Sequence, residues 1–343
     1  MGVVRLGFPV KVLGERGFKS NDSRRWQSGP HLRVSIEYLH AIFDYLDRHS
    51  IRMYRMSSDV APYVTHPDLP QFHGQIREAA PELAALGRRA RDLDLRLSFH
   101  PSQFIVLNAP DETVRRKSMW DLETQAEILD LMGLGDEAVL VIHAGGAYGD
   151  VEAAIDRWVA TYAELAEPVR RRLVLENDDI RFSAADVWRI HERTGVRLVF
   201  DVQHHQCLSP AGWELLPTME RFIGTWPAGG ARPKIHFSSP RTELREVARR
   251  NRKTGKKERV LMAPIWTGHA DFIQPFDFIR FARETAHLEF DVMLEAKAKD
   301  LALLRLWRDL ACYAPDVAPR FGAAAVSEPE PEIEIPADAV EAE

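Results

Sequence analysis

The stretch at residues 172–202, RLVLENDDIRFSAADVWRIHERTGVRLVFDV, contains the structural unit that the rest of the chain repeats. Residues 172–177 and 197–202 are short runs of branched apolar residues, as found in buried β-strands. Between them, residues 183–194 have the spacing of apolar side chains that is typical of an amphipathic helix. A strand, a helix and a second strand in this order predict a β-α-β unit with parallel strands.

The same alternation occurs along the whole chain. Strand-like runs are predicted at 3–8, 51–56, 95–100, 138–143, 172–177, 197–202, 233–238 and 290–296. Helical spacing follows each run, near 33–48, 75–92, 113–132, 151–166, 183–194, 214–224, 275–286 and 298–313. Strands that each precede a helix, eight times over, predict an α/β fold in a single domain, a (β/α)8 TIM barrel. A doubly wound open sheet is the alternative, but it does not explain why so many strands end in residues that could bind a metal.

The net charge of the chain comes from its last residues. The chain of 343 residues has a net charge of −6, and residues 319–343 hold seven acidic residues and one arginine. Subtracting them from the 45 basic and 51 acidic residues leaves 44 of each in residues 1–318. The segment is rich in Pro, Glu and Ala without apolar periodicity. We therefore expect a neutral barrel domain at 1–318 and a disordered acidic tail at 319–343.

Cysteine content and hydropathy favour a cytoplasmic protein. Cys207 and Cys312 are the two cysteines of the chain, which argues against a disulfide framework. No apolar run approaches the roughly 18 residues of a membrane span, and the first residues, MGVVRLGFPVKV, lack the apolar region of a signal peptide. We expect a soluble, cytoplasmic monomer that does not contact a membrane.

Histidine or carboxylate residues lie at the ends of six successive predicted strands. They are His100, His143, Glu176, Asp201, His236 and Glu295, with His204 just beyond the sixth strand and His269 in the segment after the seventh. Because the carboxyl ends of barrel strands form one mouth, these side chains should converge. Imidazole and carboxylate groups suit Zn, Mn or Fe. Eight such groups exceed the need of one ion, and the two oxygens of Glu176 could bridge two. We predict two or three divalent ions, which favour in-line attack on a phosphodiester.

Lys234 is an unusual neighbour for a metal cluster. It lies two residues before His236, so both side chains point to the same interior side of the strand. An ammonium group beside several cations would be repelled. Lys234 should therefore lose its proton, pair with a carboxylate, or carry an added carboxylate group.

A basic segment follows the seventh predicted strand. Residues 241–259 contain nine basic and three acidic residues within a long connection at 239–274. A solvated loop is the simplest interpretation of an isolated run of charge. Because this connection lies on the side of the barrel where active sites form, contact with phosphates is the alternative. Its candidate DNA-binding residues are Arg249, Arg250, Lys256 and Lys257.

Several long motifs resemble those of the UV damage endonucleases. They are RMSSDVAPY (55–63), LSFHPSQFIVLNAP (97–110), LVIHAGGAYGD (140–150), LVLENDD (173–179), VFDVQHH (199–205), KIHFSSPR (234–241), GHADFI (268–273) and DVMLEAKAKDLALLRL (291–306). The resemblance extends from about residue 3 to residue 314. It implies a TIM barrel similar to endonuclease IV that nicks duplex DNA 5′ to pyrimidine dimers and some other lesions. The implied cofactor is a cluster of Mn-type ions, with Zn, Fe and Mg as alternatives.

The resemblance also implies roles for individual residues. It assigns metal binding to the eight strand-end residues already described, and it matches Lys234 to a carboxylated lysine of the family. Gln103 and Phe104 match a pair that enters the duplex and fills the space left by extruded bases, although family members often have tyrosine at the second position. Packing of Phe104 within its own loop is the alternative.

The N-terminal segment differs from the family pattern. Phe8, Val10 and Val12 stand where related sequences have tyrosine or polar residues. The lesions that this chain would accept are therefore not implied by the resemblance. A divergent relative with a different substrate is the alternative.

We predict a metal-dependent DNA repair endonuclease that nicks damaged double-stranded DNA 5′ to UV lesions, with Glu176, Lys234 and His236 as catalytic residues. Three alternatives stay open. A sugar isomerase or epimerase of the xylose-isomerase-like group would use similar ligands but would not need the basic loop. A multinuclear iron oxygenase would also use such ligands, and a non-catalytic lesion-binding module would hold its metals for structural reasons.

Overall fold

Eight parallel strands close into a barrel in the computed structural model, which describes residues 2–251 and 253–323. The strands are β1 (Leu6–Pro9), β2 (Met53–Arg55), β3 (Arg96–Phe99), β4 (Val139–His143), β5 (Leu173–Glu176), β6 (Arg197–Asp201), β7 (Lys234–Phe237) and β10 (Asp291–Leu294). Their order around the barrel is β1-β10-β7-β6-β5-β4-β3-β2. The predicted TIM barrel is confirmed, and each strand lies within or at the edge of its predicted run.

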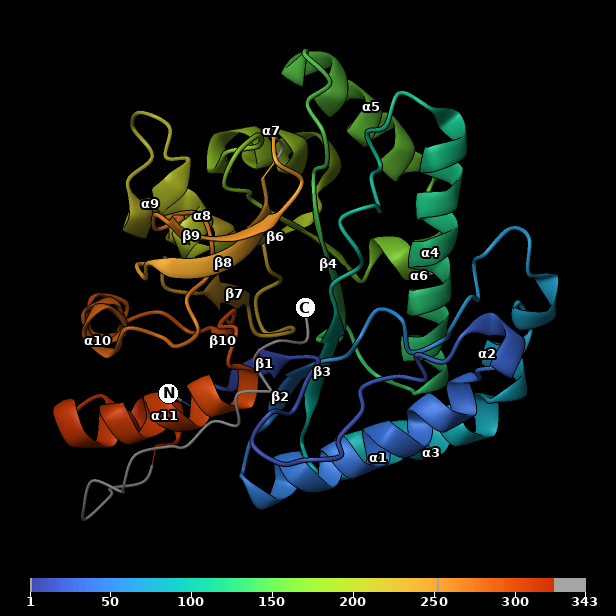
Figure 1. Cartoon of the computed structure of the whole chain (residues 1–343), viewed down its shortest axis with the longest axis horizontal. Helices are drawn as coiled ribbons and strands as arrows, with labels where there is room; N and C mark the ends of the chain where they lie inside the picture. Colours follow the sequence, from blue (N-terminus) through green and yellow to red (C-terminus); the bar gives the residue numbers. More distant parts are fainter. Residues whose placement is uncertain (1, 252, 324–343) are drawn as a thin grey trace.

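Helices surround the strands (Figure 1). They are α1 (Leu32–Arg48), α2 (Gln75–Glu78), α3 (Ala80–Asp92), α4 (Glu112–Leu131), α5 (Val151–Glu164), α6 (Glu167–Arg170), α7 (Ala184–Thr194), α8 (Val202–Cys207), α9 (Leu215–Ile223), α10 (Pro275–Glu284) and α11 (Lys299–Tyr313). Short 3-10 turns lie at Trp26–Ser28, Pro70–Phe72 and Ala318–Phe321. The helix expected at 75–92 is divided into α2 and α3, because Pro81 in the first turn of α3 has no N–H to continue the preceding helix.

The β5-α7-β6 unit follows from its sequence. Ser183 and Asp186 form a capping box that satisfies backbone N–H groups at the start of α7. The helix ends at Gly195, whose φ of 71° suits glycine better than any residue with a Cβ. Asn177 joins the two strands, since its side chain accepts from the Asp201 N–H and donates to the Asp201 carbonyl. These contacts fix the ends of β5 and β6 beside each other.

The barrel interior has an apolar side and a polar side. Val139, Val141, Val174 and Val199 form a small buried cluster with Trp226. These valines lie two or four residues before His143, Glu176 or Asp201, so the alternation of strand side chains puts valines below and candidate ligands above.

Buried charges occupy the polar side. The guanidinium of Arg96 in β3 pairs with Asp291 in β10, with an N–O distance of 2.8 Å. Lys234 lies in β7, and its Nζ donates to Ser98 Oγ at 2.9 Å. The interior is therefore filled by side chains, as in other TIM barrels, and the open space lies at the mouth.

The long connection after β7 contains a structure that the sequence pattern did not predict. Strands β8 (Arg245–Arg250) and β9 (Lys257–Met262) pair in antiparallel order and form a separate two-stranded sheet. Most of their side chains are exposed. The basic segment is thus a hairpin outside the barrel sheet, and alternation along its strands sorts its cations onto two faces.

The packed chain extends beyond residue 318, where we expected the barrel to end. Phe321 is buried, and the guanidinium of Arg320 donates to the carbonyls of Ala282, Thr285 and Leu288. The expected disorder from residue 319 is therefore wrong for residues 319–323. The rest of the predicted tail, 324–343, lies outside the described residues. None of the helices described here is long and apolar enough to span a membrane.

Candidate metal centre

The eight predicted ligands meet at the carboxyl ends of the strands. Strand register puts His143 beside Glu176 and Asp201 beside His236. Asp201 also accepts the backbone N–H of His204 at 2.7 Å and thereby caps α8, the short helix that carries His204. His269 reaches the site from the connection after β9, where it forms an isolated bridge with Pro240.

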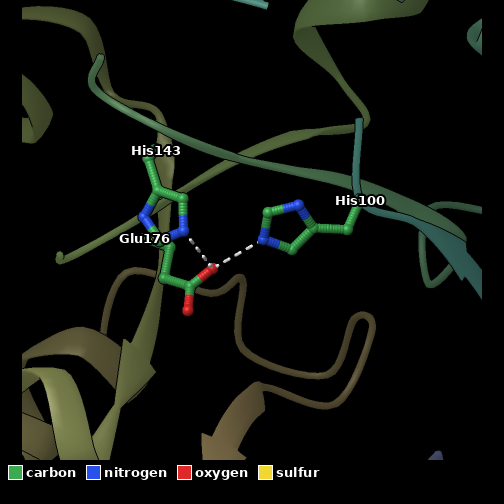
Figure 2. Close-up of side chains that lie close together, drawn as sticks. All are labelled: His100, His143 and Glu176. Carbon is green, nitrogen blue, oxygen red and sulfur yellow. Dashed lines mark hydrogen bonds and ion pairs between the residues drawn. The ribbon is translucent and has the colours of Figure 1, made fainter. Parts of the chain in front are cut away.

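Glu176 lies at the centre of this group. Its side chain is fully buried, and its Oε2 is 3.1 Å from His100 Nε2 and 3.7 Å from His143 Nε2 (Figure 2). Its other oxygen, Oε1, lies 2.8 Å from His236 Nδ1 and 3.5 Å from His204 Nδ1. One carboxylate therefore faces imidazoles from four different segments, two on each of its oxygens.

Two sets of possible ligand atoms share Glu176. His100, His143 and Glu176 form one set, and Glu176, Asp201, His236 and Glu295 form the other, with all the atoms of a set within 4.8 Å of one another. His269 extends the second set, because its Nδ1 is 3.7 Å from Glu295 Oε2. This arrangement fits two neighbouring cations bridged by Glu176.

Several candidate ligand residues have buried polar atoms that a metal ion could satisfy. Asp201 Oδ2, His236 Nε2 and His143 Nδ1 are buried and have no hydrogen-bond partner in the described part of the chain. Leaving such an atom unsatisfied costs about 1–3 kcal/mol, and more for a charged group. Cations bound here would compensate these groups, and the set of imidazole nitrogens and carboxylate oxygens is one that Mn, Zn and Fe accept. The residues present therefore fit a metal centre.

Burial and neighbouring charges shift the pKa values of the candidate ligands. Burial raises the pKa of Asp201 to about 8, although the charge of His204 opposes the shift. Burial lowers the pKa of His236 to about 4, against the opposing charges of Glu176 and Glu295. Burial alone would raise the pKa of Glu176, but His236 and His143 hold it well below its ordinary value. The neutral ring of His236 keeps a nitrogen lone pair free for a cation.

Lys234 lies below the ligands and is buried. Burial holds its pKa well below the usual value, and the charges of Arg55 and Arg96 add to this effect. Of the alternatives for Lys234, loss of its proton therefore agrees with its surroundings. The predicted carboxylation of its amine stays a prediction.

Gln103 and Phe104 lie in the loop between β3 and α4, a few residues from His100. Phe104 is 77% exposed, so it does not pack within its own loop. A cavity of about 320 Å³ beside the loop is lined by His100, Gln103, His143, Ile180 and His204, among others. Gln103 lines this cavity, whereas Phe104 lines a second cavity that shares Ser102 and Ile105 with the first. The exposed ring of Phe104 is available to stack on a base.

The hairpin places Arg249 and Arg250, two of the predicted DNA-binding residues, on opposite faces. Arg250 lies directly opposite Lys257, and Arg249 lies opposite Glu258. Lys256 is exposed in the turn between the strands, where its carbonyl accepts the N–H of Asn251. The like charges of Arg250 and Lys257 destabilise the hairpin because they lie directly opposite each other. Arg249 instead faces the carboxylate of Glu258.

The sequence pattern did not single out Arg55 and Gln203. Arg55 ends β2, and its guanidinium pairs with Glu295. Because an arginine does not bind metals, its place at a strand end gave no signal of a role in this site. Gln203 is buried and donates to the carbonyls of Trp266 and Gly268, which holds the segment before His269. Its position next to His204 was the available signal.

Phe8 and Val12, which depart from the family pattern, are buried in the core. Phe8 packs edge-on against Tyr54, with ring centroids 5.5 Å apart. Val10, between them, has a φ of 64°, which is rare for a β-branched residue, and its carbonyl accepts from Tyr54 Oη at 2.5 Å. In this chain, Phe8 and Val12 therefore stabilise the barrel.

A closed (β/α)8 barrel with histidine and carboxylate side chains gathered at its mouth defines a TIM-barrel protein with a candidate multinuclear metal centre. The profile of the UV-endonuclease UvdE family matches residues 32–324, and the chain belongs to this family. The chain is 34% identical over 273 residues to the UV DNA damage endonuclease of Bacillus velezensis. This alignment covers 78% of this chain and 77% of that protein.

Solved structures agree with the family assignment. The crystal structure of SacUVDE superposes with a TM-score of 0.74 at 29% identity, covering 90% of this chain and 98% of that one. Endonuclease IV from Thermus thermophilus matches with a TM-score of 0.52 at 16% identity, covering 89% of this chain and 98% of that one. This second likeness concerns the fold alone.

The pKa of Asp201 leads to a prediction for metal binding. A cation needs the carboxylate form of Asp201, which is protonated below about pH 8 in the metal-free protein. Affinity for Mn²⁺ should therefore rise by about tenfold or more per pH unit between about pH 6 and about pH 8, with release of protons. His204 adds a second proton, because, against the opposing effect of burial, the charge of Asp201 raises its pKa to about 9. Calorimetric titration of the metal-free protein in buffers of different ionisation enthalpy measures both effects.

Asp201→Asn is the matched control, because it keeps the size of the side chain and removes the titrating group. It should bind Mn²⁺ more weakly and with a shallower dependence on pH. Equal affinity of the parent protein at about pH 6 and about pH 8 would contradict the prediction.

Proposed function

We propose that this chain is a metal-dependent DNA repair endonuclease that nicks damaged duplex DNA on the 5′ side of UV lesions. The observation that carries the proposal is the position of Glu176, shared by two sets of ligand atoms at the barrel mouth. Two neighbouring cations are the arrangement that phosphodiester cleavage uses. Membership of the UV-endonuclease family supports DNA as the substrate.

The residues at the barrel mouth have different roles in the proposed reaction. His100 and His143 approach one oxygen of Glu176, and His204 and His236 approach the other, so Glu176 would help to hold cations on both sides of its carboxylate. Asp201, His269 and Glu295 complete the set. When bound, two or three divalent ions supply Lewis acidity toward the phosphate, the attacking water and the leaving oxygen. We propose Mn, with Zn, Fe and Mg as the alternatives to test.

Hydrolysis adds water across the bond between phosphorus and the 3′ oxygen. One new end carries a 3′ hydroxyl and the other a 5′ phosphate, and the second proton of the water must leave the site. Lys234 is buried two residues before His236, and burial holds its pKa well below the usual value, so that a neutral amine there would avoid repulsion of bound cations. We propose that Lys234, free or carboxylated, His236 and Glu176 are catalytic residues, and that all three would fix the positions of the bound ions.

Damaged duplex DNA would contact two surfaces beside the mouth. Gln103 lines the cavity that reaches the candidate ligands, and the exposed ring of Phe104 follows it in the same loop. The face of the hairpin that carries Arg250 and Lys257 also carries Arg259, which pairs with Glu246 on the same face at 3.4 Å. Arg250 and Lys257, two cations directly opposite each other, favour a polyanion as partner. One chain supplies all the candidate ligands, which supports a monomer as the active unit.

Nicking of UV-irradiated supercoiled plasmid by the Mn-loaded protein tests the proposal, with unirradiated plasmid and chelator as controls. Glu176→Gln should abolish nicking and lower the metal content, because an amide cannot bridge two cations as a carboxylate does. Circular dichroism should show a folded barrel. A metal-loaded protein that binds irradiated DNA without cutting it would favour the lesion-binding module, and near-normal nicking by Glu176→Gln would remove its bridging role.

The hairpin yields a prediction that depends on its register. Replacing both Arg250 and Lys257 with Ala should weaken binding to damaged and undamaged duplex alike. It should also reduce the slope of log affinity against log salt by about 0.9 for each phosphate that the hairpin no longer neutralises. Fluorescence anisotropy over a series of salt concentrations measures both.

Arg249→Ala is the matched control for the hairpin, because it removes one cation that faces Glu258 across the strands. Its slope should change less than that of the double variant. Unchanged affinity and slope in the double variant would mean that the hairpin is solvated surface without a role in DNA binding.

Gln103 and Phe104 should affect lesion recognition and not metal binding. Replacing both with Ala should keep the metal content and lose about 1–3 kcal/mol of binding to damaged duplex, the value of one stacked base, with much less loss on undamaged duplex. His100→Ala should do the reverse and reduce metal content first, because His100 lies 3.1 Å from Glu176. Equal losses of the double variant on both DNAs would indicate ordinary backbone contacts.

A further inference from the structure

Arg55 lies at the mouth and is neither a candidate metal ligand nor part of the exposed recognition surface. Arg55 ends β2, and its guanidinium pairs with Glu295 Oε1. Both side chains are nearly buried, with 14% of Arg55 and 10% of Glu295 exposed. Arg55 thus completes the ring of strand ends on the side of the barrel where no candidate ligand occurs in the described β1 and β2.

Glu295 is already surrounded by other partners. Its Oε1 is 3.2 Å from His236 Nδ1, and its Oε2 is 3.7 Å from His269 Nδ1. Because it belongs to the second set of candidate ligands, a bound cation would share its negative charge. The guanidinium of Arg55 would then lack a full counter-charge in a site that has gained positive charge.

A guanidinium carries a permanent positive charge in proteins. A guanidinium kept beside bound cations therefore requires an anion. The anion that enters the mouth during the proposed reaction is the phosphodiester itself.

The guanidinium of Arg55 also has N–H donors beyond the one that Glu295 accepts. It carries five N–H donors in a planar fork that matches two oxygens of a phosphate. Within the described residues, Glu295 is the hydrogen-bond partner found for them. The remaining donors and the partial exposure of Arg55 leave a place for a second acceptor beside Glu295.

We propose that Arg55 is a further catalytic residue, whose guanidinium binds a non-bridging oxygen of the scissile phosphate and stabilises the charge that grows there as water attacks. Glu295 orients the guanidinium at the edge of the cluster. This inference rests on the proposed endonuclease function. It assigns the β2 side of the mouth to the substrate phosphate and the other strands to the cations.

The test compares Arg55→Gln and Arg55→Lys with the parent protein, each loaded with Mn²⁺. Arg55→Gln should reduce the rate constant of nicking under saturating protein by about 100- to 1000-fold, as expected for loss of one transition-state donor. Its metal content and its affinity for undamaged duplex should stay unchanged. Arg55→Lys should recover part of the rate, because it restores the charge without the fork.

Binding of inorganic phosphate, measured by calorimetry on the Mn-loaded proteins, gives a readout that does not depend on DNA cleavage. Arg55→Gln should bind phosphate at least about tenfold more weakly than the parent, in line with the loss of a charge-assisted hydrogen bond. Arg52→Gln is the matched control, since Arg52 immediately precedes β2 at its other end and pairs with Asp47 at 3.0 Å. It should leave phosphate affinity and nicking unchanged.

The outcomes separate this inference from the proposed function. A parent protein that fails to nick DNA but loses phosphate affinity in Arg55→Gln would refute the endonuclease and support the phosphate contact. Metal content that falls in step with activity in Arg55→Gln would overturn the inference, because Arg55 would then only position Glu295. Equal phosphate affinity in the parent and Arg55→Gln, or no phosphate binding by the parent, would overturn it as well.

Discussion

The structure of the mouth depends on one buried carboxylate. Glu176 is inaccessible to solvent and receives imidazoles from four segments, at 2.8 to 3.7 Å. A carboxylate in such a place is costly unless positive charge or hydrogen bonds compensate it. The imidazoles do so for Glu176, whereas one oxygen of the neighbouring Asp201 is buried without a hydrogen-bond partner among the residues that the structure describes. Bound cations would remove the remaining imbalance.

The barrel makes this arrangement possible because its interior is not uniform. Beneath His143, Glu176 and Asp201 the interior is valine, which packs tightly and excludes water from below. Beneath His236 and Glu295 it is charged, with Lys234 bonded to Ser98 and Arg96 paired with Asp291. The apolar side supports the ligands rigidly. The polar side sets the charge around them, through a lysine that can lose its proton and arginines that cannot.

Recognition and chemistry are built on different parts of the chain. The candidate ligands lie on strand ends or within a few residues of them, except His269, whose segment is held by the bonds of Gln203 to Trp266 and Gly268. Phe104 and the hairpin project from connections and are exposed. Rigid strands suit ligands that must keep their spacing, whereas loops can vary between relatives with different lesions.

The sequence by itself determined the order of strands and helices and the set of candidate ligands, because six of the eight end an apolar run of their own strand and need no distant contact to be recognised. It also carried the long motifs that resemble the UV damage endonucleases. Only the tertiary structure decided which atoms meet. The pairing of Arg55 with Glu295, the sharing of Glu176 by two sets of ligands and the pairing of Arg250 opposite Lys257 depend on strand register and barrel closure. Those are set by packing between segments far apart in the chain, which local patterns do not encode.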